Sequence, residues 1–367
     1  MFGSTVNPSQ FPVRPHEATV ATTHKTQFKT SSTRADSKRM TIVDVAQKAG
    51  VGTMTVSRAL NRPEMVSTDL RKRILKAVEE LGYIPNRVAG GLASGTAKAI
   101  SVIVPTLNHP VYVPFLEGLY SLLPQEGYQI LLGTNEYQLE AEENLIATLL
   151  GWQPDAIVIA GVDHSLRTRN MLAQARVPVV EIMDLTEHPI DMNIGFSHEH
   201  VGVATANFLA DKGYKHIAYA GMLSQLDLRG AKRMKSFVAT LKRRKLPHYI
   251  VSNDKPSSIG VGKALMVDLL EKHPEVDAVF FANDDLAAGA LFECQRRKIK
   301  VPKDIAIIGF NDSDIASQVN PALTTVSTPR FEMGRLAADM LLRRLRGTRV
   351  DSTRIDIGFR IVEREST

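Results

Sequence analysis

The chain has 367 residues, 44% of them hydrophobic, which fits two or three compact units of ordinary composition. No run of 18 apolar residues occurs, so we expect no membrane-spanning helix, and a single cysteine, Cys294, excludes an intrachain disulfide and is typical of a reducing cytoplasm. The formal net charge of +6 is unevenly distributed.

Positive charge is concentrated at the start of the chain. Residues 1–39 carry six basic and two acidic groups, a net charge of +4, and residues 40–96 carry eight basic and five acidic groups, a net charge of +3. The remaining 271 residues are therefore close to −1. A basic amino-terminal quarter on a nearly neutral body is typical of nucleic-acid binding, because phosphates attract the basic part.

Residues 1–39 are rich in Ser, Thr and Pro and lack helical or strand periodicity, so we expect a disordered basic tail. They superficially resemble a transit peptide but have no apolar core of a secretory signal. Two other interpretations stay open: sequence upstream of a start at Met40, and a basic arm that adds nonspecific phosphate contacts.

Three helices are predicted in residues 40–85. The first covers Thr41 to Ala49, where a hydroxyl precedes an apolar face, and Gly50 supplies the left-handed backbone of a tight turn. The second covers Thr53 to Leu60 and turns polar side chains outward, and the third covers about Ser67 to Leu81. Two helices joined through a tight turn and braced by a third predict a helix-turn-helix unit, whose second helix suits a major groove.

The motifs AxxAGVxxxTVSRxLN in residues 46–61, Val66-Ser67, and GYIPNRVAxxLA in residues 82–93 resemble the lactose-repressor family of transcriptional regulators. Within that family, VPVVExMD in residues 177–184 and NDDLAxGAxFECQRxxxKVPxDxAIxGF in residues 283–310 are most similar to the gluconate-operon repressors. The resemblance extends to about residue 365. It implies a dimer that reads a palindromic DNA operator and a small effector, with gluconate as the leading candidate.

Residues 86–96 follow Pro85, which stops the third helix, and Asn86 can cap a new one. Gly90 and Gly91 weaken this short helix, so we expect it to be largely unfolded off DNA. The resemblance implies a hinge helix that forms over the minor groove, where a leucine matching Leu92 wedges into a base step. The alternative is a flexible Gly-rich linker.

The predicted DNA contacts divide into base and phosphate contacts. Thr53, Met54 and Arg58 are expected to reach base edges, with Arg58 preferring guanine, whereas Thr41, Asn61 and Ser67 are expected to contact phosphates. The full predicted DNA-binding set is Thr41, Thr53, Met54, Thr55, Ser57, Arg58, Asn61, Ser67, Asn86, Val88 and Leu92.

From Ile100 onward, short apolar runs such as ISVIVP, DAIVIAG and DAVFFAN alternate with amphipathic stretches, which predicts parallel sheets covered on both faces. The fold class is thus an all-α helix-turn-helix headpiece plus an α/β body. The resemblance implies a periplasmic-binding-protein-like body of two lobes, 97–192 with 325–348 and 193–324 with 349–365. It places the helix Arg330 to Arg346 on the first lobe and a closing strand, about Arg354 to Arg360, in the second.

Ligands bind beyond the carboxyl ends of parallel strands, where polar residues gather in this sequence. The resemblance assigns Tyr112 to the pocket wall, Arg233 to ligand oxygens and Asp284 to ligand hydroxyls, and Arg229 lies one turn before Arg233. Alternatives stay open: a solvated face for the two arginines, a helix N-cap for Asp284, and an exchange of roles with Asp227. The predicted effector-binding set is Asn108, Tyr112, Asp184, Arg229, Arg233, Asp284 and Asn311.

The sequence lacks the motifs of nucleotide binding, metal binding and hydrolytic catalysis. The segment Ser258 to Ala264 resembles a phosphate-binding loop but has Ser257 for its first glycine and no hydroxyl at Ala264. No HExxH or GxSxG spacing occurs, so we expect no metal, no cofactor and no catalysis. Cys294 lies in a helical pattern and is expected to be buried rather than reactive.

The resemblance therefore implies a cytoplasmic, nucleoid-associated, homodimeric repressor released by a sugar acid. A guanidinium suits the carboxylate, and polar acceptors suit the hydroxyls. Idonate, ketogluconate, a sugar phosphate or a corepressor protein are alternative effectors. From another class, a periplasmic solute-binding protein shares such a body but needs a secretion signal and carries no headpiece.

Overall fold

The computed structural model describes residues 40–84, 96–108, 110–222 and 227–367, which divide into one unit up to Pro85 and a second from Asn86 onward. The tail 1–39 and the predicted DNA contacts Asn86, Val88 and Leu92 lie outside the described residues. Among the described helices, none combines the length and the apolar composition that crossing a membrane requires.

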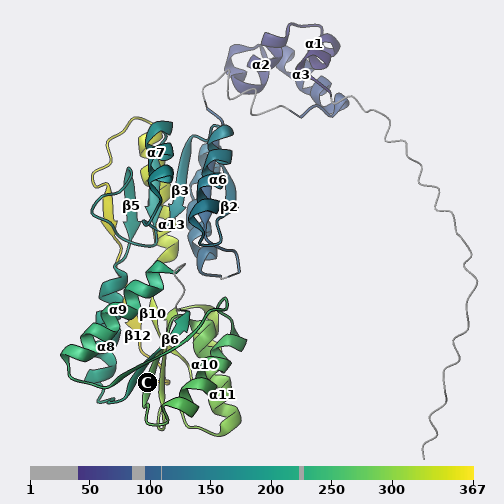
Figure 1. Cartoon of the computed structure of the whole chain (residues 1–367). Coiled ribbons are helices and arrows are strands. Elements are labelled where there is room, and N and C mark those ends of the chain that lie inside the picture. The colour runs from purple at the N-terminus through teal and green to yellow at the C-terminus, as the bar shows by residue number, and fades with distance from the viewer. Residues whose placement is uncertain (1–39, 85–95, 109, 223–226) are drawn as a thin grey trace, which may run out of the picture. The chain divides into compact units, whose positions relative to one another are not determined.

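The first unit consists of the three predicted helices: α1 (Ile42–Ala49), α2 (Thr53–Asn61) and α3 (Thr68–Leu81), with a 3-10 turn, η1 (Pro63–Met65), between the last two (Figure 1). Thr41 caps α1 in a capping box with Asp44, and Gly50 ends it in the left-handed conformation (φ 61°). Val45, Val56 and Ile74, one from each helix, are fully buried together. The predicted helix-turn-helix unit is confirmed.

The first lobe of the body is built on a six-stranded sheet in the order β11-β5-β4-β3-β1-β2, in which all pairs are parallel. The inner strands β1 and β3 are almost wholly buried, because helices cover both faces. The strands are β1 (Ala99–Val104), β2 (Gln129–Thr134), β3 (Ala156–Ala160), β4 (Val179–Ile182), β5 (Met192–Gly195) and β11 (Arg354–Asp356). The helical segments are η2 (Pro110–Tyr112), α5 (Val113–Tyr120), η3 (Leu123–Glu126), α6 (Leu139–Gly151), α7 (Leu166–Ala175) and α13 (Arg330–Leu345).

The second lobe has a sheet in the order β12-β10-β9-β8-β6-β7, parallel except for the β10–β12 pair. Figure 1 shows β6, β10 and β12 with α8 to α11 in this lobe, and α13, coloured yellow-green, with the first lobe. The strands are β6 (Ile217–Met222), β7 (His248–Asn253), β8 (Ala278–Phe281), β9 (Ala306–Asn311), β10 (Thr324–Ser327) and β12 (Arg360–Val362). The helices are α8 (His198–Asp211), α9 (Leu228–Arg243), α10 (Ile259–Lys272), α11 (Asp284–Arg297) and α12 (Asp314–Gln318).

The strand pairings correct the predicted lobe boundaries. Residues 193 and 194 pair with β4 and residue 195 pairs with β11, so all three belong to the first sheet, whereas residues 325–327 pair with β9 in the second. The predicted closing strand from Arg354 to Arg360 is two strands, since β11 joins the first sheet and only β12 joins the second. The three crossovers therefore follow β5, β10 and β11. These short strands have no apolar run, so only their hydrogen-bonded neighbours show to which of the two sheets each strand belongs.

Helix α13 packs on α5 at a crossing that requires two glycines. A Cβ atom on Gly334 would lie 2.0 Å from the carbonyl oxygen of Phe115, and one on Gly118 would lie 2.1 Å from that of Phe331. The two backbones are therefore in direct contact, which fixes the return of the chain to the first lobe after β10. The predicted packing of this helix on the first lobe is confirmed.

We predict that Gly334→Ala destabilises the protein by about 1–3 kcal/mol, because the new methyl group meets backbone rather than a movable side chain. Urea unfolding followed by circular dichroism measures this loss. Gly151→Ala is the matched control, since a Cβ at that helix end meets nothing within 4 Å. Equal midpoints for the two variants would contradict the close crossing.

Candidate functional site

Helix α2 presents a polar face away from the core of the first unit. Val56 and Ala59 are buried, whereas Met54 is 67% exposed and Thr53 and Arg58 are also exposed. These three side chains, predicted to reach base edges, therefore lie on the open side of the helix. Thr55 and Ser57, also in the predicted set, are half-buried at the borders of that face.

The predicted phosphate contacts lie at helix ends. The Thr41 hydroxyl donates to Asp44 Oδ2 (2.7 Å) and accepts from the Asp44 N–H, so it is engaged in capping α1. Asn61 Nδ2 donates to Ser57 Oγ over 3.3 Å at the end of α2. Ser67 takes the N-cap position of α3 and is exposed. These are positions at which side chains and helix amides commonly meet a DNA backbone.

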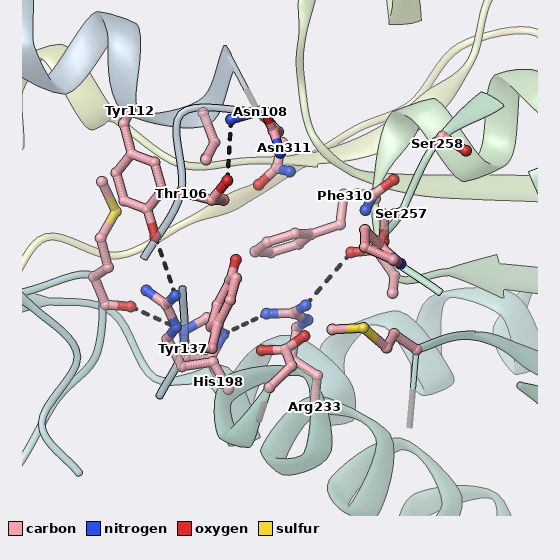
Figure 2. A pocket seen from close by; sticks show the side chains of 18 of the residues that line it. Thr106, Asn108, Tyr112, Tyr137, His198, Arg233, Ser257, Ser258, Phe310 and Asn311 are labelled. Carbon is pink, nitrogen blue, oxygen red and sulfur yellow. Dashed lines mark hydrogen bonds between the residues drawn. The ribbon is translucent and has the colours of Figure 1, made fainter. Parts of the chain in front are cut away.

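A cavity of about 520 Å³ lies between the two lobes of the body, at the carboxyl ends of strands from both sheets. Figure 2 shows Tyr112 on one side of it and Ser257 and Ser258 on the other, with Phe310 and Arg233 between them. Five of the predicted effector residues line it: Asn108, Tyr112, Arg229, Arg233 and Asn311. The other polar lining residues are Thr106, Glu136, Tyr137, His198, Asp227, Asp254, Ser257, Ser258, Asn283 and Thr328.

Arg233 is held deep in this cavity with only 5% of its surface exposed. Its Nη1 lies 2.9 Å from Nδ1 of His198, Nη2 donates to the Ala282 carbonyl (3.4 Å), and its guanidinium carbon lies 4.1 Å from the centre of the Phe310 ring. Stacking on an aromatic face favours a guanidinium over an ammonium here. A solvated face is thus wrong for Arg233.

Arg229 reaches from the second lobe to the first. Its Nη2 donates to the hydroxyl of Tyr112 over 3.1 Å. Tyr137, whose pKa is raised by burial, also lines the cavity beside these two residues. Glu136 and Tyr137 both have left-handed backbone (φ 49° and 62°), an unfavourable conformation that such sites often contain.

The sequence missed Tyr137 and His198 as lining residues. Tyr137 follows strand β2, and its place after a strand end was the available signal. No sequence pattern marked His198 as a cavity residue. It is the first residue of α8, and it reaches the cavity only because the chain crosses from β5 to the second lobe just before it. The apolar lining residues Met183, Phe196 and Phe310 were also not foreseen.

Asp184 and Asp284 do not line this cavity, which corrects their predicted place. Asp184 is 1% exposed and accepts a hydrogen bond from Lys232 Nζ (2.6 Å). Asp284 accepts from Thr325 Oγ1 (2.5 Å) and from the N–H and Oγ of Ser313 (2.8 and 2.9 Å). Buried carboxylates need such donors, so both oxygens of Asp284 bond within the second lobe.

Asp284 is also not the N-cap of α11. Asn283 takes that position, and its Oδ1 accepts from the Leu286 N–H (3.0 Å). Asp284 instead borders a second, smaller cavity of about 400 Å³, together with Arg330. Asp227, for which an exchange of roles with the two arginines stayed open, lines the main cavity. Its Oδ1 also accepts a hydrogen bond from the Gly230 N–H and so caps α9.

Lys232 forms a second polar contact between the lobes. It lies on α9, and its Nζ bonds both Asp184 (2.6 Å) and Asp163 (3.0 Å), which follow strands of the first sheet. Burial raises the pKa of Asp184, while the hydrogen bond and charge of Lys232 oppose that rise.

Other candidate chemistries have structural explanations. Ser258 caps α10 by accepting from the Val261 N–H, so the segment that resembles a phosphate loop is a capped helix start. Cys294 is buried at 1% exposure, as predicted, and burial raises the pKa of its thiol to about 12. Within the described ranges, no group of three or more His, Cys, Asp or Glu side chains is arranged to hold a metal ion.

A helix-turn-helix unit followed by a two-lobed α/β body with a polar cavity between the lobes defines a ligand-responsive DNA-binding protein. The family model "Bacterial regulatory proteins, lacI family" matches residues 41–86, and "Periplasmic binding protein-like domain" matches residues 206–367. The HTH-type transcriptional regulator GntR of Escherichia coli (strain K12) is 39% identical over 322 residues, 88% of this chain and 97% of that protein.

Two further similarities agree. The HTH-type transcriptional regulator IdnR of Escherichia coli (strain K12) is 34% identical, over 88% of this chain and 97% of that protein. The crystal structure of a LacI-family transcriptional regulator from Silicibacter pomeroyi is 34% identical, covers 89% of this chain and 99% of its own, and has a TM-score of 0.85. The chain belongs to the lacI family of bacterial transcriptional regulators.

We predict that Arg58→Ala weakens operator binding by about 1–3 kcal/mol and relaxes discrimination at one base pair, because a guanidinium on the open face of α2 can bond one guanine in two places. Fluorescence anisotropy on operator and single-base variants measures both effects. Lys76→Ala, an exposed cation on α3, is the control and should leave discrimination intact. Equal weakening of Arg58→Ala on specific and random DNA would argue against base readout.

We predict that Lys232→Met destabilises the body by about 1–3 kcal/mol at pH 8, because Asp184 stays buried without its cation. The loss of Lys232 raises the pKa of Asp184 in the folded protein further. The loss of unfolding free energy is therefore largest above that raised pKa, where the buried carboxylate is charged. It shrinks as the pH falls and Asp184 becomes protonated in the folded protein. Unfolding midpoints between pH 5 and pH 8 measure it.

Lys212→Met is the control for this experiment, since its partner Glu363 is exposed and the pair contributes little. A deficit for Lys232→Met that does not change with pH would show that the lost packing of the lysine stem, rather than the charge of Asp184, causes it.

Proposed function

We propose that the protein represses genes of sugar-acid utilisation by binding a palindromic operator as a homodimer, and that gluconate is the inducer that releases it. The observation that carries the proposal is the pair Arg229 and Arg233, two guanidinium groups on one helix that line a single cavity between the lobes. The resemblance to gluconate-operon repressors supports the same ligand.

The cavity chemistry matches a sugar acid. A planar guanidinium binds a carboxylate with two parallel hydrogen bonds, so an acid head group pairs with the arginines. Hydroxyl groups need both donors and acceptors, which Asn108, Asn311 and Ser257 supply around the same space. The volume of about 520 Å³ is typical of a site for a small molecule.

The proposed switch follows from the position of the cavity between two lobes. An inducer changes operator affinity only to the extent that it binds one arrangement of the lobes better than the other. The arginines and Tyr112 come from different lobes, so a ligand that contacts both stabilises one arrangement. We propose that this change reaches the headpieces through residues 86–96 and that the protein acts in the bacterial cytoplasm, without catalysing a reaction.

We predict that gluconate binds the wild-type protein in isothermal titration calorimetry, and that glucitol, which lacks the carboxylate, does not. Arg229→Met should weaken gluconate binding by about tenfold to a hundredfold, because a hydrogen-bonded charge pair is lost. Lys235→Met, an exposed cation on the same helix, should bind gluconate normally. An operator footprint that persists at saturating gluconate would contradict the proposed switch.

The ligand panel should include idonate, ketogluconate and a sugar phosphate, since these share the acid and hydroxyl groups. A stronger response to one of them, with no heat from millimolar gluconate, would replace gluconate as the inducer and leave the repressor assignment in place.

A further inference from the structure

One imidazole lies between the cavity arginine and the first lobe. His198 is the first residue of α8, directly after the crossover from β5, and it is buried. Its Nδ1 lies 2.9 Å from Nη1 of Arg233, and its Nε2 lies 2.9 Å from the carbonyl oxygen of Met183 at the end of β4. Figure 2 shows the contact between His198 and Arg233 as a dashed line beside the cavity.

The two partners fix which nitrogen carries the proton. A guanidinium has only donors, so Nδ1 of His198 must accept from Arg233. A carbonyl only accepts, so Nε2 must donate to Met183. The imidazole is therefore neutral with its hydrogen on Nε2. Burial and the nearby charges of Arg233, Arg229 and Lys232 hold the pKa of His198 well below its usual value, in agreement with this tautomer.

The orientation that His198 gives Arg233 leaves further N–H donors of the guanidinium without a partner in the described part of the chain. Arg233 Nη1 bonds the imidazole and Nη2 bonds the Ala282 carbonyl, while the guanidinium stacks on Phe310. Among the described residues, Arg233 Nε has no hydrogen-bond acceptor although it is buried. Each Nη also carries a second N–H that these contacts do not use, and this N–H can donate to an oxygen of a ligand in the cavity.

The other side of the imidazole reaches a strained position of the first lobe. Met183 has left-handed backbone (φ 69°), lines the cavity and directly precedes Asp184, which bonds Lys232. The rings of Phe196 and Phe310 pack around His198, with centres 4.7 and 6.2 Å away. These contacts restrict the rotation of the imidazole.

We propose that His198 is a positioning residue with two separable tasks: Nδ1 holds Arg233 ready for the effector, and Nε2 links the occupied arginine to the first lobe through Met183. This inference rests on the proposed effector function. His198 need not touch the ligand itself. Its Nδ1 determines the affinity for the effector, and its Nε2 determines how far the bound effector releases the operator.

Two amide variants separate the tasks. The amide of His198→Asn occupies roughly the place of Nδ1, so its oxygen can accept from Arg233, but nothing reaches Met183. The amide of His198→Gln occupies roughly the place of Nε2, so its NH₂ can donate to Met183, but Arg233 loses its acceptor. Each variant is the control for the other, since both replace the ring by an amide.

Calorimetry and operator binding with gluconate give the expected results. His198→Gln should bind gluconate about tenfold to a hundredfold more weakly, because the arginine is no longer held, yet release the operator fully once saturated. His198→Asn should bind gluconate almost as the wild type does but release the operator less at saturation, because the link to the first lobe is lost.

Similar losses of gluconate affinity in both variants would overturn the proposal, since His198 would then act only by filling space. Wild-type affinity and response in both variants would overturn it equally. Circular dichroism melts establish that each variant folds.

A wild-type protein that binds no gluconate refutes the proposed inducer but still leaves this inference testable without ligand. Crystal structures of the two free variants decide it then: Arg233 should stay stacked on Phe310 in His198→Asn and leave that place in His198→Gln. The same arginine position in both would overturn the positioning role.

Discussion

Three cations on helix α9 are partly or wholly buried between the two lobes, and each of them contacts the first lobe directly or through one further residue. Arg229 bonds Tyr112, Lys232 bonds Asp184 and Asp163, and Arg233 reaches Met183 through His198. A buried charge is tolerated only with a partner, so the lobes must meet in an arrangement that satisfies all three. The shape and the charge of the cavity follow from this constraint.

The same contacts explain how a small ligand can move large parts of the body. We propose that a carboxylate in the cavity offers Arg229 a stronger acceptor than the phenol of Tyr112, so that the contacts between the lobes change. The backbone has unfavourable left-handed conformations at Glu136, Tyr137 and Met183, and all three residues line the cavity. The three crossovers are the covalent connections between the two lobes.

Much of the fold could be predicted because it depends on local patterns. The capping hydroxyl of Thr41 and the left-handed Gly50 fix α1 and its turn with few alternatives, and the buried strands β1, β3 and β8 are continuous apolar runs. The strands β5 and β11 were assigned to the wrong lobe, because their sequences are mixed and their assignment depends on which neighbour they pair with.

The cavity was predicted in part for a related reason. Asn108 and Tyr112 follow a strand whose carboxyl end must face the cavity, and Arg229 and Arg233 share a helix face, so sequence spacing was sufficient. Asp184 and Asp284 also follow strands, but their oxygens bond Lys232 and Thr325 instead. Whether a polar side chain at a strand end faces a ligand or a neighbour depends on which donors lie within reach.

The sequence by itself determined the helix-turn-helix unit, the parallel α/β character of the body and the kind of chemistry gathered at the strand ends, because caps, turns and hydrophobic periods act over a few residues. Only the tertiary structure decided where the chain crosses between lobes, which carboxylates are withdrawn from the cavity, and that His198 stands between Arg233 and Met183. Those features join residues far apart in the chain, and their energies depend on burial and on hydrogen-bond partners that no local pattern contains.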